Sequence, residues 1–153
     1  MTLTNAEMLT HNGLLTRSRP DTNKLHDQLA KDSIAVCQWG LSELRLINDL
    51  RFTWLILVPQ RENVAEWFEL DDQDQQILHQ ETMRAARMLK AKTNCTKINI
   101  GAIGNVVRQL HVHVIARFEG DACWPRPVWG SAMEPMSEFA LVTRLAEVRS
   151  WFE

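Results

Sequence analysis

Two histidines and a glutamine alternate with apolar residues in the segment 109–114, QLHVHV. Successive side chains of a β-strand point to opposite faces, so Gln109, His111 and His113 are expected on one face. Neighbours on that face lie about 7 Å apart along the strand, which lets both imidazoles contact one phosphate group or one metal ion. A neutral imidazole, with an ordinary pKa of about 6.5, can act as a nucleophile at neutral pH. The opposite face is predicted to be core and carries Leu110, Val112, Val114 and Ala116.

A turn with two glycines comes just before this strand, in the segment 99–105, NIGAIGN. Glycine lets backbone N–H groups approach a ligand closely and form an anion-binding concavity. Such a turn commonly does no more than join two strands, and two histidines can simply lie half-buried on an exposed sheet face. Next to each other, the two features predict a phosphate cradle at Gly104 and Asn105. There backbone N–H groups and His113 would offset the charge on the phosphoryl oxygens while His111 attacks.

The composition is that of one globular domain of 153 residues, with a net charge of −2 and 45% hydrophobic residues. This charge argues against a general basic field for nucleic acid, and the longest apolar run, residues 54–58, is far too short to span a membrane. The three cysteines are widely spaced and form no CxxC motif. Residues 1–20 contain no apolar leader segment. These features predict a cytoplasmic chain with a tail at 1–20 and a single domain at 21–153.

Apolar periodicity and turn residues predict an α+β fold in which helices pack on an antiparallel β-sheet meander. The clearest helix spans residues 71–92, with acidic residues in its first turns, lysines in its last turn and apolar residues at helical spacing. Another helix is expected to begin at Asp21 or Thr22, and a last one to span roughly 137–149. Strands are predicted at 34–39, 44–47, 52–58, 97–100 and 106–118.

This pattern resembles the histidine-triad family, whose signature has three histidines alternating with apolar residues. The resemblance rests on Asn99-x-Gly101, on Gly104-Asn105 and on the QLHVHV strand. It extends over roughly residues 33–118, because an upstream block ends in an apolar run and a proline as in the family. It implies a homodimeric nucleotide hydrolase or transferase that acts at the α-phosphate and needs no cofactor or metal.

The resemblance also implies roles for individual residues. The family's nucleophilic histidine matches His111, and its last histidine, which holds the phosphate oxygens, matches His113. The aspartate that binds the ribose hydroxyls matches Asp49, and the asparagine that approaches the phosphate matches Asn99 after a one-residue gap. We therefore expect a two-step reaction in which His111 forms a phosphohistidine that water then hydrolyses.

The sequence departs from the family pattern at three positions. Gln109 stands in place of the first triad histidine, Trp54 in place of an upstream histidine, and Val106 in place of a common serine or threonine. Glutamine can donate and accept hydrogen bonds but cannot transfer a proton at neutral pH. Because an amine leaves poorly without a proton and a polyphosphate leaves readily, we expect phosphoanhydride substrates to be preferred over phosphoramidates.

Two further groups are candidates for binding the substrate. In the family the segment after the triad reaches towards the active site, so Trp124, Arg126 and Trp129 are candidates to close the pocket. Arg126 could meet a distal phosphate. Simple packing of this proline-rich loop is an equal alternative. Apolar side chains that could sandwich a purine, and that are otherwise ordinary core, are Ile34, Leu46, Ile47 and Trp54.

Three other functions remain open on the sequence alone. With Gln109 and Trp54 in place of histidines, the chain could bind a nucleotide without turning it over. The His-x-His pair could supply two ligands to a metal ion, with Asp49, His79 or Glu119 as the third. The six tryptophans and the proline-rich loop could instead serve a protein partner.

Overall fold

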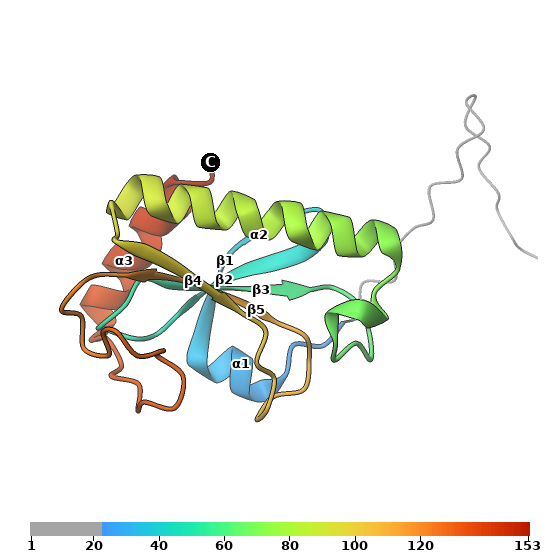
Figure 1. The fold of residues 1–153 in the computed structure, drawn as a ribbon, viewed down its shortest axis with the longest axis horizontal. Coiled ribbons are helices and arrows are strands. Elements are labelled where there is room, and N and C mark those ends of the chain that lie inside the picture. The colour runs from blue at the N-terminus through green and yellow to red at the C-terminus, as the bar shows by residue number, and fades with distance from the viewer. Residues whose placement is uncertain (1–22) are drawn as a thin grey trace, which may run out of the picture.

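A five-stranded antiparallel sheet organises the part of the chain that the computed structural model describes, residues 23–153 (Figure 1). The predicted tail at 1–20 and the predicted helix start at Asp21 or Thr22 lie outside these residues. In chain order the elements are α1 (Asp27–Asp32), β1 (Ser33–Gln38), β2 (Ser42–Ile47), β3 (Trp54–Pro59), the 3-10 helix η1 (Trp67–Glu69), α2 (Asp72–Thr93), β4 (Lys97–Gly101), β5 (Val112–Arg117) and α3 (Glu138–Ser150).

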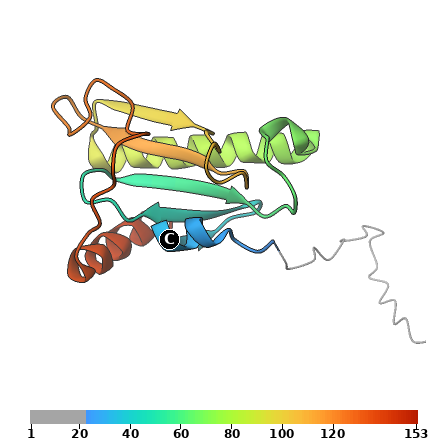
Figure 2. The same cartoon turned by 90° about the horizontal axis from the view of Figure 1, so that it is seen from below.

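The strands are arranged in the order β1-β2-β3-β5-β4, and each neighbouring pair is antiparallel. The first three strands form the predicted meander. The chain then crosses the sheet in α2 and returns in β4 at the far edge, so β5 lies between β3 and β4 (Figure 2). The predicted α+β class, with helices packed on an antiparallel sheet, is confirmed. The strand that carries His113 is an inner strand with a partner on each side.

Helix α2 covers one face of the sheet (Figure 1). The Asp71 side chain caps its first turn by accepting from the backbone N–H of Asp74, and Asn94 ends it with a left-handed φ of 52°. Its apolar stripe packs on the inward side chains of β3 and β5. Burial of each such side chain contributes about 1.5–3 kcal/mol, which fixes the face of β5 that points inward. The cluster includes the predicted core residues Leu110, Val112, Val114 and Ala116, together with Leu55, Leu57, Leu78, Ala85 and Leu89.

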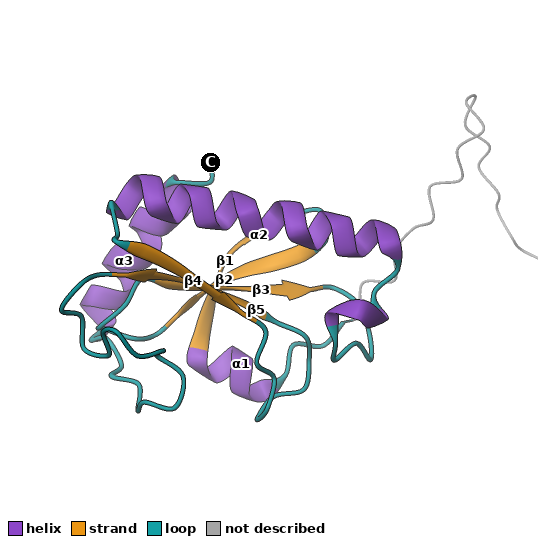
Figure 3. Cartoon of the chain, viewed as in Figure 1, coloured by secondary structure: helices purple, strands orange, loops and turns teal. Residues whose placement is uncertain are grey.

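The opposite face of the sheet is covered by the short helix α1 and by loops (Figure 3). Trp54 pairs with Ile115, and Ile56 pairs with His113, in the ladder between β3 and β5. Directly opposed residues project from the same face. The side of the sheet away from α2 therefore carries His113 beside a second apolar cluster, to which Leu29 of α1 also belongs.

Several predicted boundaries need correction. β5 begins at Val112, and residues 106–111 form a loop in which the N–H of Leu110 donates to the carbonyl of Val64 at 2.9 Å, outside the ladder. Helix α1 begins only at Asp27, because His26 is its N-cap.

Leu46 is fully buried in the α2 cluster, so the expectation that it contacts a purine is wrong. The helix η1 was not predicted. Within residues 23–153, no helix has both the length and the apolar character needed to cross a membrane.

Candidate active site

One backbone hydrogen bond orients the ring of His111, which is 6% exposed. Its Nδ1 lies 2.7 Å from the carbonyl oxygen of Gln109. A carbonyl oxygen only accepts, so Nδ1 carries the proton of the neutral ring and Nε2 keeps its lone pair. Burial lowers the pKa of His111 below its ordinary 6.5; the bond to Gln109 raises it, and the charge of His26 lowers it further. The ring is therefore neutral at neutral pH, with Nε2 available for attack.

Burial also keeps the ring of His113 neutral, but its tautomer is the opposite one. Its centroid lies 4.8 Å from that of His111, and the two rings meet edge to face. The indole Nε1–H of Trp54 donates to Nδ1 of His113 at 2.9 Å, so the proton of the neutral ring lies on Nε2. Burial, reinforced by the neighbouring His111, lowers the pKa of His113 to about 3. His113 thus offers a neutral N–H donor and carries no positive charge at neutral pH.

Two tryptophans enclose His113 from opposite elements. The ring centroids of Trp54 and Trp129 each lie 5.5 Å from that of His113. Trp129 reaches the site from the loop after β5 by packing on Gly101, which pairs with His113 in the ladder. A Cβ atom at Gly101 would lie only 3.0 Å from Cη2 of Trp129. The indole Nε1 of Trp129 is buried with no hydrogen-bond partner among residues 23–153.

A pocket of about 260 Å³ joins His111 to the glycine turn. Gly104 has a left-handed φ of 64°, a conformation that glycine adopts without steric cost. The glycine turn and His111 thus face one space, whose size suits a phosphate group rather than a whole nucleotide. The residues that line this phosphate pocket are Ala65, Glu66, Ala102, Ile103, Gly104, Asn105, Arg108, Leu110 and His111.

The side chain of Gln109 points to the N-terminal segment and not to a substrate space shared with His111. Its Oε1 accepts from the backbone N–H of His26 at 2.8 Å, and its Nε2 donates to the carbonyl of Lys24 at 3.3 Å. The sequence did not identify His26 as a neighbour of the site. A polar residue directly before a helix is a capping signal that marks this position, and His26 Nδ1 indeed accepts from Gln28 N.

The structure gives three predicted binding residues other partners. Asn99 shares the sheet face of His113, but its Oδ1 accepts from the buried guanidinium of Arg117 at 2.8 Å. Asp49 is fully buried, and both of its carboxylate oxygens accept from Arg51. The side chain of Arg126 is exposed, and its carbonyl accepts from Arg117 at 2.9 Å. Their contacts with phosphate and ribose stay predictions.

The metal alternative finds no third ligand in the described part of the chain. Among residues 23–153, no three His, Cys, Asp or Glu side chains are grouped so that they could hold a metal ion. Asp49, one predicted third ligand, is enclosed by Arg51. In addition, Nδ1 of His113 already accepts from Trp54.

Comparison with known proteins identifies the class. Residues 28–120 match the family model of the HIT domain, which is more than half of the chain, so the chain belongs to the histidine-triad family. A histidine-triad protein from Sinorhizobium meliloti 1021 is 51% identical, with 83% of this chain and 95% of that chain covered and a TM-score of 0.79. One from Bradyrhizobium japonicum is 40% identical, with 85% and 98% covered and a TM-score of 0.80. One from Marinobacter aquaeolei VT8 is 34% identical, with 84% and 94% covered and a TM-score of 0.81. No curated protein matches the chain.

The Trp54→Phe substitution tests how His113 is kept neutral. Burial and the neighbouring His111 lower the pKa of His113 to about 3 and would remain in the variant, but loss of the indole N–H frees Nδ1 for a proton, so we expect this pKa to rise. Loss of one hydrogen bond should lower the free energy of unfolding by about 1 kcal/mol at neutral pH. Imidazole ¹⁵N NMR reports the tautomer and the pKa, and urea unfolding reports stability.

The pH dependence of unfolding gives the control. A His113 pKa below 6.5 means that the unfolded chain binds the proton more readily, so wild-type stability falls as the pH drops from 6.5 towards 3. This fall should be smaller in Trp54→Phe and unchanged in Trp39→Phe, whose indole packs on Phe152. Equal pH dependence in all three proteins would contradict the role of Trp54.

The Gly101→Ala substitution tests the packing of Trp129 on Gly101. The new Cβ would lie 3.0 and 3.2 Å from two carbons of the indole, so the indole must shift away from His113. Such overpacking costs about 1–3 kcal/mol. We expect a change in tryptophan fluorescence and lower stability in urea. Gly40→Ala is the matched control, because its Cβ would meet Glu81 at an ordinary 3.8 Å; the same change in both variants would refute the contact.

Proposed function

We propose that this chain is a hydrolase or transferase of nucleotides that cleaves a phosphoanhydride bond at the α-phosphate through a phosphohistidine on His111. Its membership of the histidine-triad family supports a nucleotide-binding or hydrolytic role. The observation that carries the proposal is the 2.7 Å hydrogen bond from His111 Nδ1 to the Gln109 carbonyl. It leaves a neutral, buried imidazole with a free Nε2 at the rim of the phosphate pocket.

In the first step Nε2 of His111 forms a bond to the α-phosphorus, and the bond from phosphorus to the leaving group breaks. The electron pair of that bond departs with the leaving group. The imidazole becomes positive as it attacks, and the Gln109 carbonyl on Nδ1–H is already oriented to stabilise that charge. Water then displaces His111 from phosphorus, gives its proton to solvent and releases the nucleoside monophosphate or, with another acceptor, a transfer product.

The neutral state of His113 fits this reaction. A donor that is neutral at neutral pH can bind a phosphoryl oxygen without attracting an anion so tightly that the product stays bound. The amide of Gln109 is already engaged by Lys24 and His26, and it has no proton to transfer. Substrates whose leaving group departs without a proton, phosphoanhydrides rather than phosphoramidates, are therefore the preferred class.

We also propose that the chain works as a homodimer in the cytoplasm, without a cofactor. β4 is an edge strand of the sheet, and an edge strand offers unpaired backbone groups to a second chain. Exposed apolar side chains lie on this edge and in the following turn, with Ile100 43% and Val106 90% exposed. The cysteines Cys37, Cys95 and Cys123 are free, which supports a reducing compartment.

Trapping of the intermediate tests the reaction. A nucleoside 5′-phosphorofluoridate should form a nucleotidyl adduct on the peptide that contains His111, seen by mass spectrometry after acid-free quench. His111→Ala should form no adduct and lose at least about 10³-fold in turnover. Because burial lowers the pKa of His111, activity should persist below pH 6.5, where an ordinary imidazole is protonated. His79→Ala, on the exposed face of α2, is the control.

Tight binding without adduct or turnover in the wild-type protein would instead identify a nucleotide-binding module. A faster reaction with an adenylylated amine than with a dinucleoside polyphosphate would reverse the substrate preference.

Sedimentation velocity tests the dimer. Ile100→Lys places a charge on the β4 edge and should convert a dimer into a monomer, because a lysine there must be desolvated on association. Phe139→Lys, at a side chain of α3 that is 83% exposed, should leave the dimer intact. A monomeric wild-type chain, or equal loss in both variants, would rule out this interface.

A further inference from the structure

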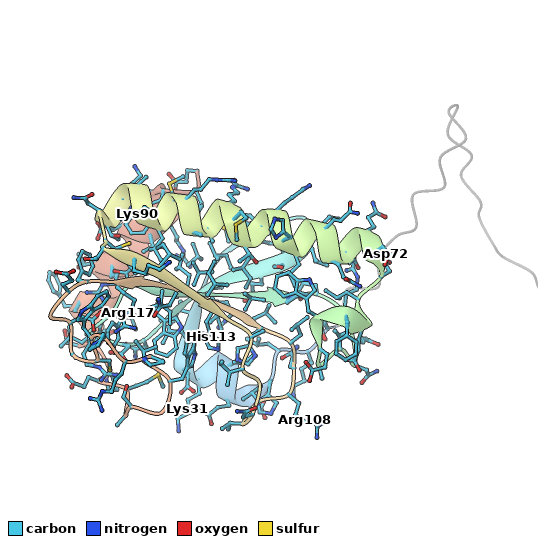
Figure 4. The ribbon with its side chains drawn as sticks, viewed as in Figure 1. Lys31, Asp72, Lys90, Arg108, His113 and Arg117 are labelled. Carbon is cyan, nitrogen blue, oxygen red and sulfur yellow. The ribbon has the colours of Figure 1, made fainter. Side chains whose placement is uncertain are left out.

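A second and larger pocket adjoins the phosphate pocket. It measures about 660 Å³, which is within the range of about 300–1,000 Å³ typical of small-molecule sites. Ala65 and Arg108 line both pockets, so the two spaces meet at these side chains. Figure 4 shows Arg108 in the loop that precedes β5, on the same side of the sheet as His113 and away from α2.

The wall of the larger pocket is held by hydrogen bonds to the end of β3 and to the loop before β5. Asn23 Nδ2 donates to the carbonyl of Pro59 at 3.0 Å, at the end of β3. Gln109 holds Lys24 and His26 with its side-chain amide, while its own carbonyl orients His111. One residue therefore fixes both the wall of the larger pocket and the nucleophile of the smaller one.

The charges of the lining leave one cation at the junction. Lys24 pairs with Asp27 at 3.6 Å, and Arg61 pairs with Asp74 at 2.5 Å. Among residues 23–153 no carboxylate forms a salt bridge with Arg108, although its charge reaches the exposed Glu69. Carboxylates also line the pockets, with Glu62 in the larger and Glu66 in the smaller. A long run of phosphates would meet these carboxylates, whereas one anionic group at Arg108 would not.

The remainder of the larger pocket suits a neutral, polar ligand. Leu25 and Val64 supply apolar surface, and the ring of His26 adds a donor. Because Nδ1 of His26 accepts from Gln28 N at 3.1 Å, Nε2 is the ring nitrogen that carries a proton. Hydroxyl and carbonyl oxygens, such as those of a nucleoside, are the acceptors that this donor fits.

We propose that the larger pocket is the subsite for the leaving group, and that it takes a leaving group with one anionic phosphoryl end at Arg108 and a nucleoside-sized neutral remainder. This assignment rests on the proposed reaction at His111. It gives Gln109 a function without proton transfer: the side chain positions the wall that receives the leaving group.

Two substrates with the same transferred nucleotide test the assignment. A nucleoside 5′-phosphorofluoridate releases fluoride, and a dinucleoside diphosphate releases a nucleoside monophosphate. Arg108→Gln should lower kcat/KM for the dinucleoside diphosphate about tenfold to a hundredfold more than for the phosphorofluoridate, the usual loss for a charge-assisted hydrogen bond. Arg108→Lys should restore part of this preference. Arg87→Gln, at an exposed arginine on α2, should change neither rate.

Equal losses on the two substrates, or none, would overturn the subsite, because the pocket would then hold the transferred nucleoside or nothing.

Binding provides a readout that needs no turnover. A nucleoside monophosphate titrated into the His111→Ala protein should shift amide NMR signals at residues 24–26 and 63–65 in addition to those of the turn at 102–105. Adding Arg108→Gln to the His111→Ala protein should remove the shifts at residues 24–26 and 63–65. If these shifts are absent from the His111→Ala protein itself, the subsite is also overturned. If the wild-type chain forms no adduct and shows no turnover, but the shifts are present, the reaction at His111 is refuted while binding in the larger pocket remains supported.

Discussion

The proposed reaction depends on a hydrogen bond between a ring nitrogen and a main-chain oxygen, from His111 Nδ1 to the Gln109 carbonyl. That oxygen is available because β5 begins only at Val112, so residue 109 lies outside the ladder. Had the strand started earlier, the carbonyl would be shared with a neighbouring strand and the ring would lose its fixed tautomer. The late start of β5 is therefore a condition for a nucleophile with a free Nε2.

A second constraint is that the site must stay neutral. Trp54 supplies an N–H to His113 as a histidine could, but an indole does not titrate in the physiological range, so the contact is independent of pH. Trp129 packs edge to face against the other side of the ring, which is 7% exposed. Placing indoles around His113 disfavours the imidazolium, because a buried cation without a partner costs several kcal/mol. In the proposed reaction, the two histidines therefore face the substrate as neutral rings, and the nearest cation is Arg108 at the edge of the phosphate pocket.

The sequence predicted what local periodicity determines and missed what depends on distant contacts. The alternation around His111 and His113, the helix at 71–92 and the glycine turn all follow from spacing within a short segment. The start of β5 does not, because it is set by a bond between Leu110 and Val64, far apart in the chain. The enclosure of Asp49 by Arg51 could not be read from a pattern either, since a lone acidic residue in a turn has many possible partners.

The backbone and the side chain of Gln109 make separate contacts. His111 needs only the carbonyl of residue 109, and any residue type supplies one. The side chain of Gln109 is therefore not needed to orient His111. Its short planar amide accepts from His26 and donates to Lys24 at the same time, which a neutral imidazole in one orientation does less readily. Both groups that it holds belong to main chain, so the bond fixes the path of residues 24–26 irrespective of their side chains. Glutamine at position 109 therefore orders the neighbouring surface without placing a charge next to His111.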